Sequence, residues 1–295
     1  MKTFFTVALS LISLFLFGQV TTKYRVDTLI AGLYETGAIA VSPDGKQLVF
    51  DSKIGGTRQL FLYTFETDEL KQLTNEPNGS EQACFHPNGK ELAFVRISDR
   101  KLCCYKLETS KISELLDRDV QAWMPQYNVA GNLLAFSGMK QHMDAIQIFT
   151  YDFKYDNLNH LTDQPTHCLY PQWSPSSELL SYVYYDQNTK TWCTTLINWY
   201  GKHYDDLHET FKNTYDLNWS LSDYKIIYVE TEKADCNLVI SRKDRSNREV
   251  LLRSPFTVKT PCWIPESNQI VFVTSDLAKN HYNILRIDLE EEINF

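Results

Sequence analysis

Residues 42–50 read SPDGKQLVF, a nine-residue unit that the chain repeats. In this unit Pro43 presets φ, and Gly45 accepts the positive φ of a tight hairpin turn. The flanking residues are therefore expected to form two antiparallel strands. Five further copies begin at residues 86, 128, 174, 220 and 264, and they read HPNGKELAF, NVAGNLLAF, SPSSELLSY, SLSDYKIIY and IPESNQIVF.

The spacing of the six copies predicts the architecture. Successive units begin 44, 42, 46, 46 and 44 residues apart, which is the length of a four-stranded propeller blade. A large apolar side chain precedes every turn and is expected to fill the wedge between blades; these residues are Val41, Phe85, Tyr127, Trp173, Trp219 and Trp263. The prediction is an all-β, six-bladed propeller, and the 17 Tyr, 16 Phe and 6 Trp of the chain favour strands in the same way.

The two chain ends are predicted to complete one blade together. The sixth unit ends near Leu289 without room for a fourth strand, while residues 24–30 precede the first unit with no other partner. An N-terminal strand in the last blade would close the ring by hydrogen bonds and protect the sheet edges.

The N-terminus resembles an export signal. Lys2 is followed by an apolar stretch from Phe4 to Phe17, so we expect a signal peptide over residues 1–18 and a single propeller domain over residues 19–295. The alternative is a retained membrane anchor, but the apolar stretch is shorter than the roughly 20 residues of a spanning helix. The signal resembles those of the Bacteroidota, which predicts a periplasmic or secreted protein of a Gram-negative cell, without an integral membrane segment after cleavage.

The repeated unit resembles the WD40-like repeat of the TolB propeller family, over nearly all of the chain after residue 18. This resemblance implies the six-bladed fold, without the additional N-terminal α/β domain of TolB. It leaves function open, because similar propellers serve as envelope scaffolds, as non-catalytic halves of prolyl oligopeptidase-like enzymes and as oligogalacturonate lyases.

The composition and the motifs limit the classes of partner and of reaction that this protein could have. A net charge of −8 without any basic run excludes a nucleic-acid partner. The chain contains no nucleophile elbow, phosphate-binding loop or paired Cys-x-x-Cys, so we expect neither an enzyme nor a cofactor. The seven cysteines are expected to be reduced core residues.

The candidate binding face carries the loops that join second to third strands and fourth strands to the next blade. Basic and aromatic side chains there suit protein recognition. The candidates are Lys53, Arg58, Arg100, Trp123, Lys140, His142, His167, Tyr185, Lys233 and His281.

Two functions therefore remain as hypotheses. The first is a non-catalytic scaffold that binds an envelope protein or peptide, and we expect it to be a monomer. The second is a metal-dependent, oligogalacturonate lyase-like enzyme, because the resemblance implies histidine ligands on the central face. The candidates for that metal site are His142, His167, His208 and His281.

Overall fold

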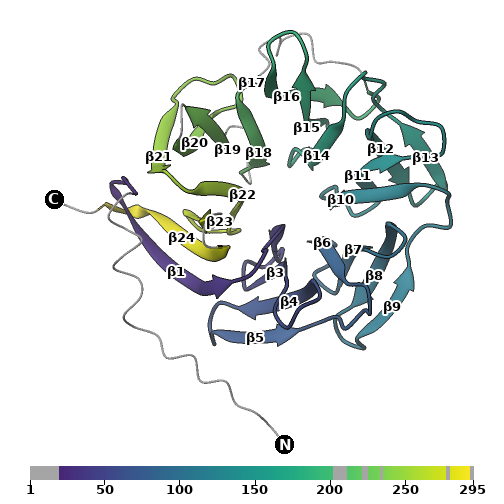
Figure 1. Cartoon of the computed structure of the whole chain (residues 1–295), viewed down its shortest axis with the longest axis horizontal. Coiled ribbons are helices and arrows are strands. Elements are labelled where there is room, and N and C mark those ends of the chain that lie inside the picture. Colours follow the sequence, from purple (N-terminus) through teal and green to yellow (C-terminus); the bar gives the residue numbers. More distant parts are fainter. Residues whose placement is uncertain (1–19, 202–210, 221–224, 233–234, 277–279, 293–295) are drawn as a thin grey trace, which may run out of the picture.

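The computed structural model describes residues 20–201, 211–220, 225–232, 235–276 and 280–292. In these ranges the chain forms six antiparallel sheets of four strands, arranged as blades around a central opening (Figure 1). The described part of the chain contains no helix that is long and apolar enough to cross a membrane. The predicted all-β, six-bladed propeller is confirmed.

Each blade runs from an inner strand beside the central opening to an outer strand. The first three blades consist of β2 (Ile39–Val41), β3 (Gln47–Ser52), β4 (Gln59–Thr64) and β5 (Glu69–Gln72); β6 (Ser80–Phe85), β7 (Glu91–Arg96), β8 (Lys101–Lys106) and β9 (Lys111–Glu114); and β10 (Gln121–Tyr127), β11 (Leu133–Met139), β12 (Gln147–Asp152) and β13 (Asn157–His160).

The other three blades follow the same order, except that the last one ends on the N-terminal strand. They consist of β14 (Cys168–Trp173), β15 (Leu179–Asp186), β16 (Thr191–Asn198) and β17 (Phe211–Lys212); β18 (Thr214–Trp219), β19 (Lys225–Glu232), β20 (Asp235–Arg242) and β21 (Glu249–Ser254); and β22 (Thr257–Trp263), β23 (Gln269–Asp276), β24 (His281–Glu292) and β1 (Tyr24–Leu33).

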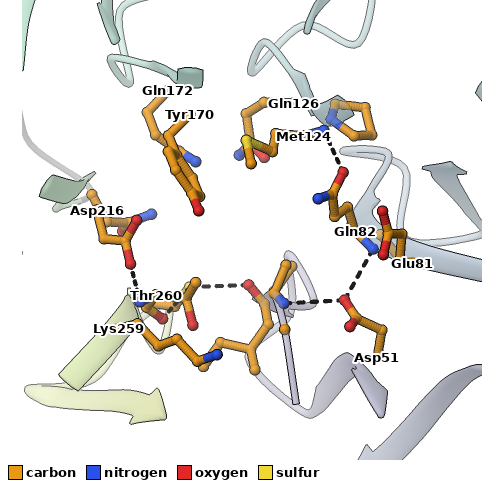
Figure 2. A pocket seen from close by; sticks show the side chains of 18 of the residues that line it. Asp51, Glu81, Gln82, Met124, Gln126, Tyr170, Gln172, Asp216, Lys259 and Thr260 are labelled. Atoms are coloured by element: carbon orange, nitrogen blue, oxygen red, sulfur yellow. Dashed lines mark hydrogen bonds between the residues drawn. The ribbon is translucent and has the colours of Figure 1, made fainter. Parts of the chain in front are cut away.

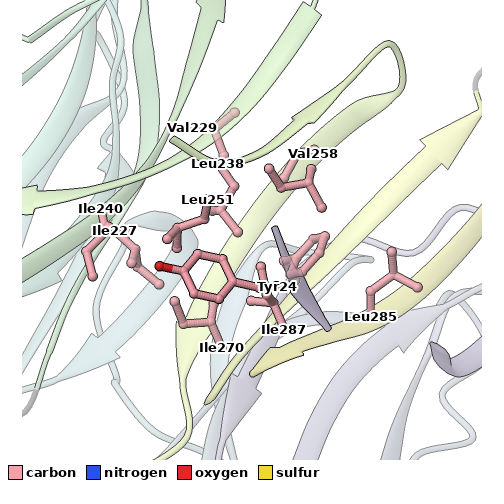
Figure 3. Packing of buried hydrophobic residues seen from close by; sticks show 12 residues of the cluster. Tyr24, Ile227, Val229, Leu238, Ile240, Leu251, Val258, Ile270, Leu285 and Ile287 are labelled. Carbon is pink, nitrogen blue, oxygen red and sulfur yellow. The ribbon is translucent and has the colours of Figure 1, made fainter. Parts of the chain in front are cut away.

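The N-terminal strand closes the ring as predicted. Strand β1 pairs antiparallel with β24, for example through Val26 opposite Ile287. At its start Tyr24 is buried in the apolar cluster between the fifth and sixth blades (Figure 3). The Tyr24 hydroxyl donates a hydrogen bond of 2.7 Å to Glu249 of β21. The strand therefore joins both neighbouring blades, and it extends three residues beyond the predicted segment.

The repeated unit supplies the core. The aromatic residue that ends each copy is almost completely buried on the second strand of its blade: Phe50, Phe94, Phe136, Tyr182, Tyr228 and Phe272. The apolar residues before the turns are more varied, because Trp173 and Trp219 are buried whereas Trp263 is only half-buried. The seven cysteines are all free, and five of them are buried.

Candidate functional site

A ring of backbone bulges surrounds the central opening. In each of five inner strands, two residues lie opposite one residue of the second strand, and the first of the two has a positive φ. These first residues are Gln82, Met124, Tyr170, Asp216 and Thr260, with φ between 49° and 57°. Positive φ is strained for residues with a side chain, and bulges reorient side chains. Five strained bulges at one place therefore mark this opening as the candidate site.

Side chains of one blade hold the bulges of the next. Asp51 accepts a hydrogen bond of 3.0 Å from the Gln82 amide N–H, and Gln82 accepts one of 2.9 Å from the Met124 N–H. On the other side of the ring Asp216 accepts one of 2.8 Å from the Thr260 N–H (Figure 2). These bonds satisfy backbone donors that the bulges remove from the sheet ladder. These three bonds therefore cross-link the inner wall at three junctions between neighbouring blades.

The bulges line a cavity of about 160 Å³ in the centre of the ring. Besides Gln82, its wall carries the side-chain amides of Gln126, Gln172 and Asn218, which come from three successive inner strands. None of the three makes a side-chain hydrogen bond to another described residue, and each is only half-buried. The amides are therefore available to a ligand as both donors and acceptors.

The side of the cavity formed by the first two blades is an ion-pair network. Arg58 contacts Asp51 and lies 3.7 Å from Glu81, which also pairs with Arg100. Burial alone would lower the pKa of Arg58, but these carboxylates raise it. A Cβ atom at Gly37 would lie 2.4 Å from Asp51 Oδ2, so glycine is needed for the close approach of this carboxylate. The charges on this side are mutually neutralised.

The opposite side of the cavity holds two charged groups outside any ion pair among the described residues. Asp216 is 8% exposed, and burial raises its pKa to about 6, against the opposing effects of the Thr260 N–H and of Lys259. Burial also lowers the pKa of Lys259, whose ammonium lies 4.8 Å from the Tyr282 ring centroid. The Tyr170 hydroxyl points into the space between them (Figure 2), and burial raises its pKa.

The pKa of Asp216 predicts a pH-dependent effect on stability. A carboxyl with a raised folded-state pKa stabilises the fold fully below its unfolded pKa of 3.8, and this contribution is lost as pH rises through 6. We expect Asp216→Asn, which keeps the acceptor for Thr260, to raise the free energy of unfolding by about 3 kcal/mol at pH 7.5. At pH 4 the two proteins should be nearly equal. Urea melts at both pH values measure this difference, and an equal gain at both would contradict the assignment.

Four of the ten predicted binding-face residues come together. Lys53 pairs with Glu35 at 2.6 Å, and Arg58 lies 3.5 Å from the same carboxylate. The Arg100 guanidinium lies 5.6 Å from the Trp123 ring centroid. These four residues form a continuous rim beside the cavity, but the charges of the three basic residues are engaged by carboxylates. This face is therefore less basic than the sequence pattern indicates.

Five other predicted residues have separate environments in the described structure. The Lys140 ammonium lies 5.3 Å from the Phe149 ring centroid, and the Tyr185 ring packs edge-on against Trp192. His167 accepts a hydrogen bond from the Ile146 N–H, which is a structural contact. His142 and His281 are exposed. Lys233 lies outside the described residues.

The three histidine candidates that the structure describes are not gathered at one site. Among the described residues, no group of three or more His, Cys, Asp or Glu side chains is arranged to hold one. His142, His167 and His281 are each exposed on a different blade, and His208 lies outside the described residues. The acidic groups in the cavity are Asp51 and Glu81, which bind arginines, and the isolated Asp216.

The sequence pattern did not predict most of the residues that line the cavity. Of the ten binding-face candidates, only Arg58 is among them. A signal was present in the four residues before the last five turns, which read QACF, MPQY, YPQW, DLNW and TPCW from residues 82, 124, 170, 216 and 260. The first residue of each tetrad occupies the bulge. In four tetrads the third residue also lines the cavity. These residues are Gln126, Gln172, Asn218 and Cys262.

Comparisons with known proteins agree on the fold. No family model and no protein of curated function matches this sequence. Among solved structures, TolB from Acinetobacter baumannii is similar with a TM-score of 0.63 and 17% identity, covering 79% of this chain and 58% of that one. The chain thus spans less than two thirds of the length of that TolB.

Two solved enzymes have a similar ring. An oligogalacturonate lyase in complex with manganese has a TM-score of 0.64 and 13% identity, over 92% of this chain and 94% of the lyase. A gluconolactonase from Xanthomonas campestris has a TM-score of 0.66 and 11% identity, over 91% of this chain and 94% of that one. With its six closed blades and these neighbours, the chain has the TolB-like six-bladed β-propeller fold.

Proposed function

We propose that this protein is a non-catalytic binding propeller of the cell envelope that receives a protein or peptide segment at the central cavity. The observation that carries the proposal is the ring of strained bulges around unused polar groups. Strain of about 1–3 kcal/mol per residue at one ring of positions is typical of functional sites. The envelope location rests on the export signal expected from the sequence.

The size of the cavity favours a small inserted group. A volume of about 160 Å³ is below the roughly 300–1,000 Å³ of sites that enclose a whole small-molecule ligand. One side chain or one chain end of a partner fits this space, while the rest of the partner contacts the surrounding face. The hydrogen bonds between bulges hold the wall in place before binding, so little ordering of the receptor opposes association.

A blocked cavity tests this function. Gln172→Arg places a long cation in the cavity, and we expect it to abolish capture of the partner from an envelope extract, as measured by affinity purification and mass spectrometry. The unaltered protein should enrich one or a few envelope proteins. Thr67→Arg is the matched control, because it makes the same charge change at an exposed turn on the opposite face.

Two results would contradict the proposed function. One is equal enrichment by Gln172→Arg and Thr67→Arg at equal melting temperature, which would place binding outside the cavity. The other is turnover of a substrate by the purified protein that Gln172→Arg abolishes, which would replace binding by catalysis.

A further inference from the structure

One carboxylate of the cavity has no described cationic partner. Three carboxylates line the cavity, from Asp51, Glu81 and Asp216, against the two cations of Arg58 and Lys259. The first two carboxylates are in contact with arginines. Asp216 is the one that no described cation approaches within ion-pair distance, so an unpaired carboxylate lies on the side of the fifth blade.

The free oxygen of Asp216 has unused polar neighbours. Its Oδ2 accepts from the Thr260 N–H, whereas its Oδ1 has no hydrogen bond from a described residue. The Thr260 hydroxyl beside it is buried without any hydrogen-bond partner. The Tyr170 hydroxyl likewise makes no hydrogen bond to the described protein and points into the cavity (Figure 2).

We propose that the cavity binds a primary ammonium group, held by Asp216, the hydroxyls of Tyr170 and Thr260, and the neighbouring amides. An ammonium has three donors, and these groups offer carboxylate, hydroxyl and amide oxygens as acceptors. A charge-assisted hydrogen bond to a buried carboxylate is about twice as strong as a neutral one. The ammonium belongs to a lysine side chain or to the N-terminus of a peptide, so this inference rests on the proposed function and names the group that is inserted.

The ammonium of Lys259 does not itself bind Asp216. This ammonium lies against the Tyr282 ring, and the carboxylate with the largest effect on it is Asp51 rather than Asp216. A ligand cation can therefore approach Asp216 from the open cavity. The overall charge of −8 also favours the approach of a cation.

Calorimetric titration with four small amides tests the inference. N-acetyl-lysine amide presents only the side-chain ammonium, and glycylglycinamide presents only the terminal one. N-acetyl-norleucine amide is the neutral control, and N-acetyl-glutamate amide is the anionic control. We expect one ammonium probe to bind at least tenfold more tightly than either control, and the preferred probe identifies the source of the ammonium.

Two variants place the probe in the cavity. Asp216→Asn should lower the affinity for the ammonium probe at least tenfold, and Tyr170→Phe should lower it severalfold. The matched control is Asp163→Asn, an exposed carboxylate in the connection between β13 and β14 on the same face, which should leave the affinity unchanged.

The pH dependence supplies an independent readout. Because Asp216 must be ionised, binding at pH 5 should be about tenfold weaker than at pH 7.5, and Asp216→Asn should abolish this dependence. Other titratable groups also face Asp216. The pKa values of the tyrosines and of the thiol are raised by burial, and the remaining groups are ion-paired or cationic, so none of them should account for a change in binding between pH 5 and pH 7.5. These groups are Tyr170, Tyr215, Cys262, Lys259, Asp51, Glu81 and Arg58.

The inference is overturned if neither ammonium probe binds at 10 mM, if a control amide binds as tightly, or if Asp216→Asn keeps full affinity. If the titration fails in this way but Gln172→Arg still fails to capture the envelope partner, the proposed function stands. If the titration fails and Gln172→Arg captures the partner as well as the unaltered protein does, the cavity is not a binding site.

Discussion

Deletion of residues 20–31 is expected to unfold the whole propeller, because these residues form most of the outer strand of the last blade. The deletion removes the pairing of β1 with β24 and the buried Tyr24 ring. Loss of one buried aromatic side chain alone costs about 3–5 kcal/mol, and a domain is stable by only about 5–15 kcal/mol. The exposed edge of β24 would in addition favour aggregation. Circular dichroism melts and gel filtration of both proteins measure the outcome.

Tyr24→Phe is the matched control for this deletion. It keeps the ring in the cluster between the fifth and sixth blades and removes only the hydrogen bond to Glu249. We expect a loss of about 1 kcal/mol, with an unchanged cooperative transition. A truncated protein that melts within a few degrees of the full chain would show that β1 does not hold the ring closed.

Trp219→Ala and Trp173→Ala should each lower the free energy of unfolding by about 3–5 kcal/mol, because both indoles are buried between blades and leave cavities. At about 2–4 °C per kcal/mol, the melting temperature should fall by more than about 6 °C. Trp263→Ala should cost less, since Trp263 is only half-buried. Urea denaturation of the three variants gives the comparison.

Phenylalanine variants separate packing from hydrogen bonding at these positions. The Trp173 Nε1–H donates a bond of 3.2 Å to the Gln126 carbonyl of the third blade, whereas the Trp219 Nε1–H is buried without a partner. Trp173→Phe should therefore destabilise the protein more than Trp219→Phe, by about 1 kcal/mol. Equal losses would show that the Trp173 hydrogen bond does not contribute to stability. A normal melting temperature with loss of partner binding only would instead place these tryptophans at an interface.

On the binding face, the repeat predicted the positions of the basic residues but not their ion pairs. The loop positions of Lys53, Arg58 and Arg100 were predictable from the repeat, and the three residues do lie at one rim. Their partners Glu35, Asp51 and Glu81 come from other strands and loops, so their neutralisation was not predictable. Basic side chains that look available in sequence are therefore occupied in the folded ring.

The sequence by itself determined the six blades, their strand order and the closing N-terminal strand, because turn residues and alternating apolar runs act locally and repeat at a fixed spacing. Only the tertiary structure decided the site. A bulge shifts one residue of an inner strand into the channel, and the neighbours of that residue are bulges from blades 40 or more positions away, such as Asp216 and Thr260. Both carboxyls are buried, and the difference between them is the cation that the fold supplies: Arg58 pairs with Asp51, whereas no described cation pairs with Asp216.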